Sequence, residues 1–338
     1  MRLLRHTILG ILLVHAFLFA NDTRISGLFF GDYYYVNQHH QQNLVGKNGF
    51  WIRRIYLTLD RNLSTAFAVR LRLEMNHPGF TTGGPGAGSA VPFVKDAYLK
   101  YSSGSTAVIL GISPSPTFAR IEQLWGYRAV EKTPVDLQKM GSSRDFGLAI
   151  RGRFASDSPL GYHIMIGNGA GAKSDANSGK KVMVSVGYYP QQGIWLEGYG
   201  DYEDRGAERR FTYQGFAGYA GTAFRLGLQY VAQQRKVGSS TTTLALASAF
   251  GVWRMQPQTS VLLRIDRLLN PNPAGNTITY LPIATTTTAT LFIAGVDWQP
   301  IEDVHFIPNV EALVYDTPDT GPKPENDVLP RLTFFITF

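Results

Sequence analysis

The chain has no cysteine, few charged residues and no long apolar segment after its first twenty residues. Without thiols it can cross an oxidising space unfolded and form no wrong disulfides. A mean hydropathy of −0.08 excludes a bundle of membrane helices. Only 17% of the 338 residues are charged, and no lysine or arginine tract resembles a nucleic-acid footprint. What is abundant instead is glycine, tyrosine and phenylalanine.

The first twenty residues, MRLLRHTILGILLVHAFLFA, are typical of a secretory signal. Arg2 and Arg5 give a positive start, an apolar run follows, and Ala20 suits the cleavage position. A membrane helix is the alternative, but the apolar run is too short for one. We therefore expect residues 1–20 to be a cleaved signal peptide and residues 21–338 to form one exported domain. Cleavage lowers the net charge of +7 by two.

From residue 24 onward, apolar and polar residues alternate in segments of about ten residues, which is the period of a β-strand. We count sixteen such segments. A soluble β-sandwich also shows this period, but its inner faces would be wholly apolar. Here the second face carries arginine, glutamate, aspartate and glutamine. In the clearest segment, FAVRLRLEM, one face has Phe67, Val69, Leu71, Leu73 and Met75, and the other has Ala68, Arg70, Arg72 and Glu74.

The connectors between these segments alternate in length, and this pattern is typical of an outer-membrane β-barrel. Long polar connectors lie between the short ones, except for two brief ones after the ninth and eleventh segments. Hydrocarbon solvates no unpaired backbone group, so the sheet must close. We predict an all-β fold, an antiparallel transmembrane barrel of about 16 strands with an aqueous channel. The short connectors are 61–65, 102–105, 155–160, 190–193, 220–223, 256–259 and 299–303.

The last segment, RLTFFITF, ends on Phe338. An even strand number puts both termini on the short-turn side, where the last strand closes against the first. Leu332, Phe334, Ile336 and Phe338 would then face lipid. A terminal phenylalanine after alternate apolar residues resembles the C-terminal signature of bacterial outer-membrane proteins. That resemblance implies recognition of Phe338 by the barrel assembly machinery, and contact with outer-membrane lipid and lipopolysaccharide.

Two further stretches resemble the phosphate-selective porins, the porin O and P group. GFWIRRIYLTLDRNL is similar to their second strand, which carries an Arg-Arg pair. EQLWGYRAVEKT followed by SSRDFGLAIRG is similar to their third long loop and the next strand. The resemblance implies a homotrimer whose third loop folds into the barrel and narrows it. It implies passive diffusion of small hydrophilic solutes, with a channel specific for phosphate or another oxyanion as the alternative.

In a water-filled barrel, the charges that face the lumen decide which solutes pass. A hairpin turn at 62–64 would place Arg54 opposite Arg72 and Tyr56 opposite Arg70. Directly opposed like charges destabilise a sheet, so we expect an anion or a carboxylate among them. The alternative is a salt-bridge network that only stiffens the wall. The predicted lumen bases are Arg54, Arg70, Arg72, Lys100, Arg151 and Arg153, with Glu74 and Asp96 as internal carboxylate partners.

Acidic residues on later segments are also expected to face the lumen, on the opposite wall. Such an arrangement would produce a field across the pore, positive on one side and negative on the other. A filter of this kind admits small polar solutes with a mild preference for anions. The predicted acidic residues are Glu197, Asp201, Glu203, Asp297 and Glu311.

Residues 113–143 form the longest connector, and a loop of this length in a compact protein is usually functional or disordered. Phe118, Ile121, Leu124 and Trp125 have helical spacing. An external lid, or a helix packed only for stability, is the alternative to inward folding. By the family resemblance, the constriction candidates are Arg120, Glu122, Arg128, Glu131, Lys132 and Lys139, and Arg144 and Asp145 anchor the loop.

Other chemistry is weakly indicated. His39 and His40, with His77 on the neighbouring loop, are metal-ligating types. Adjacent side chains on an extended chain point apart, so we expect a solvated loop there. The strand histidines, His163 and His305, alternate to the lumen, and a barrel hydrolase would need a Ser–His pair on the lipid side. We expect no catalysis, cofactor, metal or nucleic-acid partner. An adhesin anchor, which would have a plugged lumen, is the remaining alternative.

Overall fold

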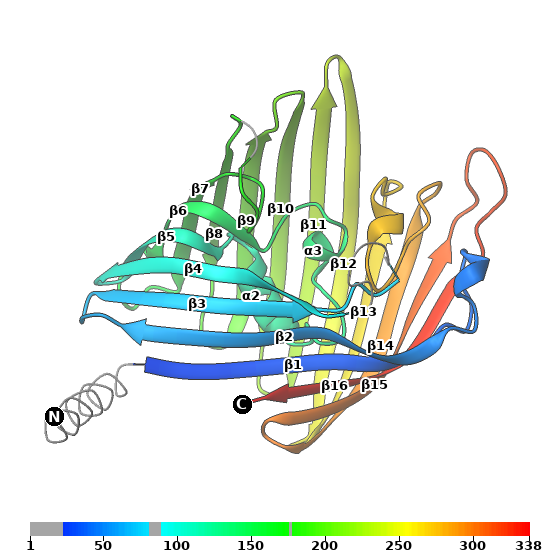
Figure 1. The fold of residues 1–338 in the computed structure, drawn as a ribbon, viewed down its shortest axis with the longest axis horizontal. Helices are drawn as coiled ribbons and strands as arrows, with labels where there is room; N and C mark the ends of the chain where they lie inside the picture. The colour runs from blue at the N-terminus through cyan, green and yellow to red at the C-terminus, as the bar shows by residue number, and fades with distance from the viewer. Residues whose placement is uncertain (1–22, 81–88, 176–177) are drawn as a thin grey trace, which may run out of the picture.

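The computed structural model describes residues 23–80, 89–175 and 178–338, which form one closed antiparallel barrel (Figure 1). The predicted signal peptide, 1–20, lies outside the described residues. Each strand pairs with the next, and β16 returns to β1, so the predicted sixteen-stranded fold is confirmed. The strands are β1 (Thr23–Tyr35), β2 (Asn48–Asn62), β3 (Phe67–Asn76), β4 (Val91–Ser103), β5 (Thr106–Pro114), β6 (Arg144–Arg153), β7 (Leu160–Gly167), β8 (Lys181–Tyr188), β9 (Gly193–Asp204), β10 (Glu208–Ala220), β11 (Phe224–Val237), β12 (Ser240–Gln256), β13 (Thr259–Leu268), β14 (Ala289–Ile301), β15 (Val304–Tyr315) and β16 (Asp327–Thr337).

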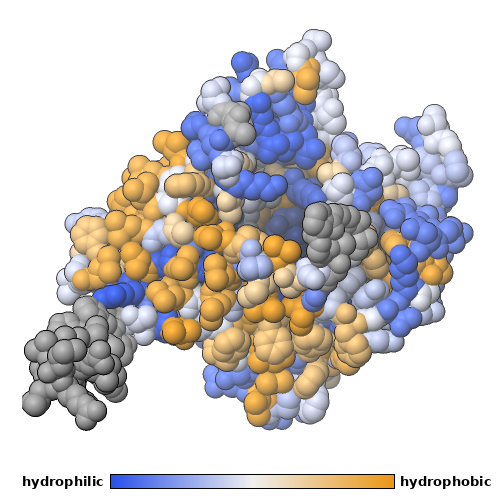
Figure 2. Space-filling model, in the orientation of Figure 1, coloured by the Kyte–Doolittle hydropathy of each residue, from blue (hydrophilic) through white to orange (hydrophobic). Residues whose placement is uncertain are grey.

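Apolar side chains cover the outside of the barrel, where a membrane would solvate them. On β11, Leu226, Leu228 and Tyr230 are exposed, whereas Gln229 and Gln233 on the other face are buried. Figure 2 shows the apolar surface over the strands and hydrophilic residues at the strand tips and loops on the upper and right sides. Polar side chains buried inside and apolar side chains exposed outside are the pattern of a transmembrane barrel. Within the described ranges, no helix is long and apolar enough to span a membrane.

The end of the chain pairs with the first strand, as expected. The backbone N–H of Gly27 donates to the carbonyl of Phe338 at 2.7 Å, and the N–H of Phe338 donates back at 3.0 Å. Leu332 and Phe338 are exposed on the outer face, with Phe338 67% exposed. These two hydrogen bonds continue the β1–β16 ladder, in which Leu28 lies opposite Thr337. The barrel therefore leaves no open sheet edge at its seam.

A β-bulge in β2 changes which side chains enter the lumen. Phe30 pairs with Arg54 but Gly31 pairs with Ile52, so Arg53 is an extra residue in the ladder. A bulge of this kind re-aims side chains, and both Arg53 and Arg54 point inward. A Cβ on Gly31 would lie 2.1 Å from the carbonyl oxygen of Trp51, so the close approach needs glycine. Simple alternation would place Arg53 in lipid, and its inward position was not predicted.

A second register shift, between β3 and β4, has the same effect. Arg72 pairs with Asp96 and Leu73 pairs with Val94, which leaves Lys95 as the extra residue. The Lys95 ammonium therefore reaches Glu74, at 3.0 Å, while Asp96 also faces inward. In both strands, two adjacent charged residues in the sequence accompany the bulge, because one of them would otherwise face hydrocarbon.

The predicted β2–β3 register was wrong. Arg70 lies opposite Asp60, and Arg72 lies opposite Thr58. The connecting turn is longer than predicted, with the N–H of Leu63 bonded to the carbonyl of Phe67 at 2.8 Å. The shift replaces the predicted opposition of Tyr56 and Arg70 by an ion pair, with Arg70 Nε 2.7 Å from the Asp60 carboxylate. Arg54 likewise does not face Arg72.

The third long loop, residues 115–143, folds into the barrel as predicted. It contains α2 (Phe118–Trp125) and the short α3 (Pro134–Leu137). The apolar face of α2 packs on the inner surface of β10, β11 and β12, and Leu124 and Trp125 are almost fully buried. Gly126 ends α2 with φ of 74°, a left-handed conformation that favours glycine. The loop therefore occupies part of the lumen rather than covering it from outside.

Candidate pore constriction

Buried arginines of the barrel wall hold the inward loop in place. Arg53 donates to the carbonyl of Val130 at 2.6 Å and pairs with the Glu131 carboxylate at 3.0 Å. Arg264 of β13 donates to the carbonyl of Lys132 at 2.5 Å. Burial alone would raise the pKa of Glu131, but the guanidinium groups of Arg53 and Arg331 hold it below its usual range. Glu131, a predicted constriction residue, is therefore a buried anchor.

The loop leaves two cavities that meet inside the barrel. A cavity of about 220 Å³ lies on the long-loop side, next to Ser142 and Tyr280. A cavity of about 400 Å³ lies on the short-turn side, next to the turns 221–224 and 257–258. Phe30, Arg54 and Arg128 line both cavities. These three residues mark the junction, and a solute crossing between the cavities would pass the two guanidinium groups.

The cavity on the long-loop side carries an excess of positive charge. Arg54 and Lys95 share one carboxylate, that of Glu74, at 3.2 and 3.0 Å. Arg128 lies between two carboxylates, 3.3 Å from Glu122 and 3.6 Å from Asp136. Charged groups that are held in place around a narrow aqueous passage bias the ions that enter it. The cationic lining residues are Arg53, Arg54, Lys95, Arg128, Lys132 and Lys139, against Glu74 and Asp136.

The predicted basic wall is present, but much of it is neutralised by ion pairs. Arg72 lies 3.4 Å from Asp96, and Arg144 pairs with the same carboxylate. With the Arg54–Glu74 pair, these contacts place the carboxylates of Glu74 and Asp96 among the arginines of this wall. Lys100 shares the inward face of β4 with Asp96. Arg151 and Arg153 lie on the inward face of β6 and line a third cavity, beside the turn 104–105.

The predicted loop residues divide between several environments. Glu122 and Lys132 join Arg128 along the two central cavities. Lys139 also lines the cavity on the long-loop side, but its ammonium donates to the carbonyl of Thr277 at 2.7 Å. Arg120, by contrast, faces the third cavity.

The two predicted loop anchors hold different segments. Arg144 donates to the carbonyl of Ser143 at 2.7 Å and pairs with Asp96. It therefore ties the end of the inward loop to β4. Asp145 instead accepts a hydrogen bond from the N–H of Gly169 at 2.8 Å, so it holds the following long loop.

The predicted acidic residues face the lumen and have local partners. Lys181 lies 3.1 Å from Asp201 and 3.5 Å from Glu203. Glu197 accepts hydrogen bonds from the hydroxyls of Thr117 and Tyr189. Local pairing weakens the field that these groups send across the pore. The other two pairs are Asp297 with His305 at 2.9 Å and Glu311 with Arg331 at 2.9 Å.

His39 and His40 do not belong to a solvated loop, and their rings do not point apart. The rings stack with centroids 4.4 Å apart, and His39 is fully buried. Asp327 accepts from the N–H of His40 at 2.7 Å and from the hydroxyl of Tyr315 at 2.5 Å. These residues fasten the loop 36–47 to β15 and β16. His77 bonds elsewhere, with its Nδ1 2.9 Å from the N–H of Ile52.

This fastening predicts acid loosening of the loop 36–47. Burial lowers the pKa of His39 to about 4, against the opposing effect of Asp327. The loop is therefore fastened with His39 neutral, and its stability falls as pH drops from about 6.5 to 4, where only the released histidine binds a proton. The protection factors of residues 36–47 in hydrogen exchange, which remove the pH dependence of the intrinsic exchange rate, should therefore fall across this range. His39→Gln should flatten the profile, and an unchanged profile would contradict the assignment.

No protein-family model matches the chain, and no curated protein matches it in sequence. Solved structures match in fold. An anion-selective porin from Comamonas acidovorans superposes with a TM-score of 0.70 at 12% identity, covering 94% of this chain and 99% of that one. The outer-membrane channel DcaP of Acinetobacter baumannii superposes with a TM-score of 0.65 at 9% identity, covering 94% and 97%. A trimer form of OmpT from Vibrio cholerae gives 0.62 at 10% identity, covering 94% and 99%. The chain therefore has the sixteen-stranded fold of outer-membrane porins.

Proposed function

We propose that the protein is an outer-membrane porin through which small hydrophilic solutes diffuse passively, with a mild preference for anions. The observation that carries the proposal is the meeting of two cavities at Arg54 and Arg128, inside a barrel that is apolar outside. Within the described ranges, six cationic side chains and two carboxylates line the cavity on the long-loop side. The similarity in fold to an anion-selective porin also supports a preference for anions.

Single-channel recording in a planar bilayer tests this function. In asymmetric KCl, we expect stepwise conductance and a reversal potential displaced toward that of chloride. Absence of conductance would overturn the diffusion channel and favour a plugged anchor. A reversal potential displaced toward potassium would overturn the anion preference, because the junction groups would then not control the passage.

The remaining features belong to the same proposal. Export through cleavage of residues 1–20 is supported by the signal-like sequence, and a homotrimer by the trimer form of one structural neighbour. Recognition of Phe338 by the assembly machinery, and contact with lipopolysaccharide, are supported by the exposed apolar end of β16. The N-terminal mass of protein purified from membranes, and its molecular mass in detergent, test cleavage and trimerisation. A retained N-terminus or a monomer would contradict them.

A specific channel for phosphate or another oxyanion is the second candidate. The observation that favours it is the third cavity, which, in the part of the chain that the structure describes, is lined by three arginines and by no carboxylate. Such a channel would show saturable, submillimolar block of chloride current by phosphate. Linear conductance without block would leave general diffusion as the function.

A further inference from the structure

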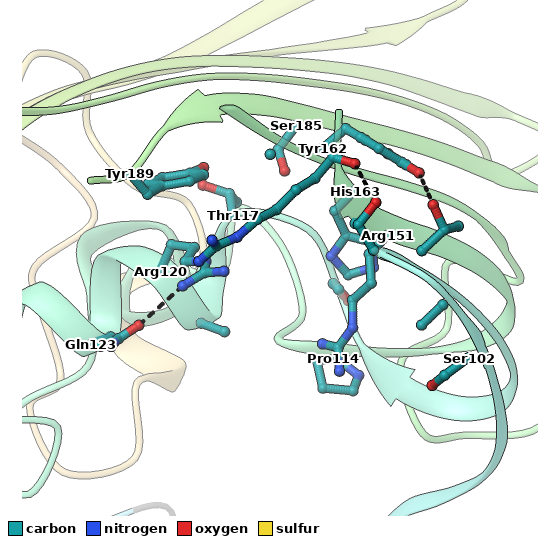
Figure 3. Close-up of a pocket in the computed structure, with 18 of the residues that line it drawn as sticks. Ser102, Pro114, Thr117, Arg120, Gln123, Arg151, Tyr162, His163, Ser185 and Tyr189 are labelled. Atoms are coloured by element: carbon teal, nitrogen blue, oxygen red, sulfur yellow. Dashed lines mark hydrogen bonds between the residues drawn. The ribbon is translucent and has the colours of Figure 1, made fainter. Parts of the chain in front are cut away.

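The third cavity, about 670 Å³ in volume, lies between α2 and the inner wall formed by β5 to β8, and neither Arg54 nor Arg128 lines it. Arg120 reaches it from α2, and Arg151 and His163 reach it from β6 and β7. Figure 3 shows Arg120 on the helix side and Arg151 beside His163 on the wall side, around the same open space. The cavity is therefore built by the inward loop and the barrel together.

The arginines of this cavity lack the carboxylate partners that the neighbouring arginines of the barrel wall have. Arg70, Arg72 and Arg144 each pair with a carboxylate. Among the described residues, neither Arg151 nor Arg153 forms an ion pair, and no carboxylate lines the cavity.

Arg120 has only weak local partners. Its guanidinium stacks over the Tyr189 ring at 5.0 Å and donates to Gln123 at 3.5 Å. Glu197, which accepts from Tyr189 and Thr117, does not line the cavity. Among the described residues, three guanidinium groups and no carboxylate line the cavity, and the carboxylate that interacts electrostatically with Arg120, that of Glu197, is already bonded to Tyr189 and Thr117.

The same cavity contains polar atoms that have no hydrogen-bond partner. Ser115 is 1% exposed, and its hydroxyl bonds to nothing in the part of the chain that the structure describes. The Nε2 of His163 is buried and likewise has no partner there. A buried polar group without a partner costs stability, and in native proteins it usually indicates water, an ion or a ligand. A ligand rich in acceptor oxygens would complement the hydroxyl and the three guanidinium groups.

We propose that this cavity is a binding site for a small oxyanion, with phosphate or a carboxylate held by Arg151, Arg153 and Arg120. The planar guanidinium group offers paired N–H donors that match two oxygens of one oxyanion. Chloride is a single atom and cannot accept such a pair of hydrogen bonds. The site lies off the junction of the other two cavities, so it would retain an anion near the short-turn end rather than select at the constriction. This inference rests on the proposed function, because the anion must reach the lumen.

Phosphate titration of the purified, folded protein tests the site, with calorimetry at constant ionic strength in chloride as the measurement. We expect saturable binding to the wild type. Arg151→Gln together with Arg153→Gln should weaken it about tenfold or more, since each removes a charge-assisted contact. The double variant Arg151→Lys, Arg153→Lys keeps the charge but loses the paired N–H donors of the guanidinium group. Its affinity for phosphate should lie between those of the wild type and the double glutamine variant. Arg235→Gln, an inward arginine outside this cavity, should bind as the wild type does.

Circular dichroism establishes that each variant is folded, and conductance in KCl is measured separately. No phosphate binding by the wild type, or equal binding by every variant, overturns the site. A protein that conducts with an anion preference but binds no phosphate overturns only this inference. A protein that binds phosphate through Arg151 and Arg153 but passes no current overturns only the proposed function.

Discussion

Replacing Arg54 and Arg128 by alanine should abolish the preference for anions and move the reversal potential in asymmetric KCl toward potassium. These two residues line both central cavities, so every ion that crosses the junction passes them. Their removal leaves Glu74, Glu122 and Asp136 with less compensation. A unit charge at about 4 Å contributes about 1 kcal/mol even in bulk water, so the ratio of chloride to potassium permeability should fall about fivefold or more.

A matched control separates position from net charge. Arg209→Ala with Arg235→Ala removes the same charge from β10 and β11 near their long-loop ends, away from the junction. This variant should shift the reversal potential much less, and its shift should disappear first as salt is raised, because mobile ions screen distant charges. Equal shifts from both double variants would mean that total charge, and not the junction, sets selectivity.

Arg53→Met should loosen the inward loop and reduce stability by about 3–5 kcal/mol, the usual cost of removing one member of a buried ion pair. The change leaves the Glu131 carboxylate buried without its 3.0 Å partner, and it removes the hydrogen bond to Val130. Asp32 loses less, because Trp51 and Thr333 still donate to it. We expect faster hydrogen exchange in residues 126–133, a lower midpoint in denaturant, and larger current fluctuations.

The double variant Arg53→Met, Glu131→Gln tests the mechanism. The second substitution removes the charge of the Glu131 carboxylate, which has lost its Arg53 partner. The double variant should therefore recover part of the lost stability, while the loop stays less tightly held. Arg53→Lys should lie between the wild type and Arg53→Met, since an ammonium cannot reproduce the fork. If Arg53→Met exchanges and unfolds as the wild type does, Arg53 does not hold the loop.

Several features of the barrel could be predicted because they depend on local regularities. Alternation places Leu332 and Phe338 outside and Arg70, Arg72 and Glu74 inside, since successive side chains of a strand point to opposite faces. The count of alternating segments predicted the number of strands, and the alternation of short and long connectors predicted the barrel layout. Helical spacing in residues 118–125 predicted α2 and its buried face.

The candidate site depends on features that this regularity does not contain. Arg53 and Lys95 enter the lumen because a bulge shifts the alternation by one residue, and the partner strand decides where that bulge occurs. The register of β2 and β3 depends on the length of their turn, so Arg70 faces Asp60 and not Tyr56.

The sequence alone determined that the chain forms strands with one apolar face, in a number and order that allow closure, because these follow from neighbours along the chain. Only the tertiary structure decided which charges meet. The 115–143 loop can reach any part of the inner wall, and contacts such as Arg53–Glu131 and Arg264–Lys132 join residues far apart in sequence. They also decide that Arg54 and Arg128 stand at the junction while Arg120 faces another cavity, since a closed barrel brings distant strands around one loop.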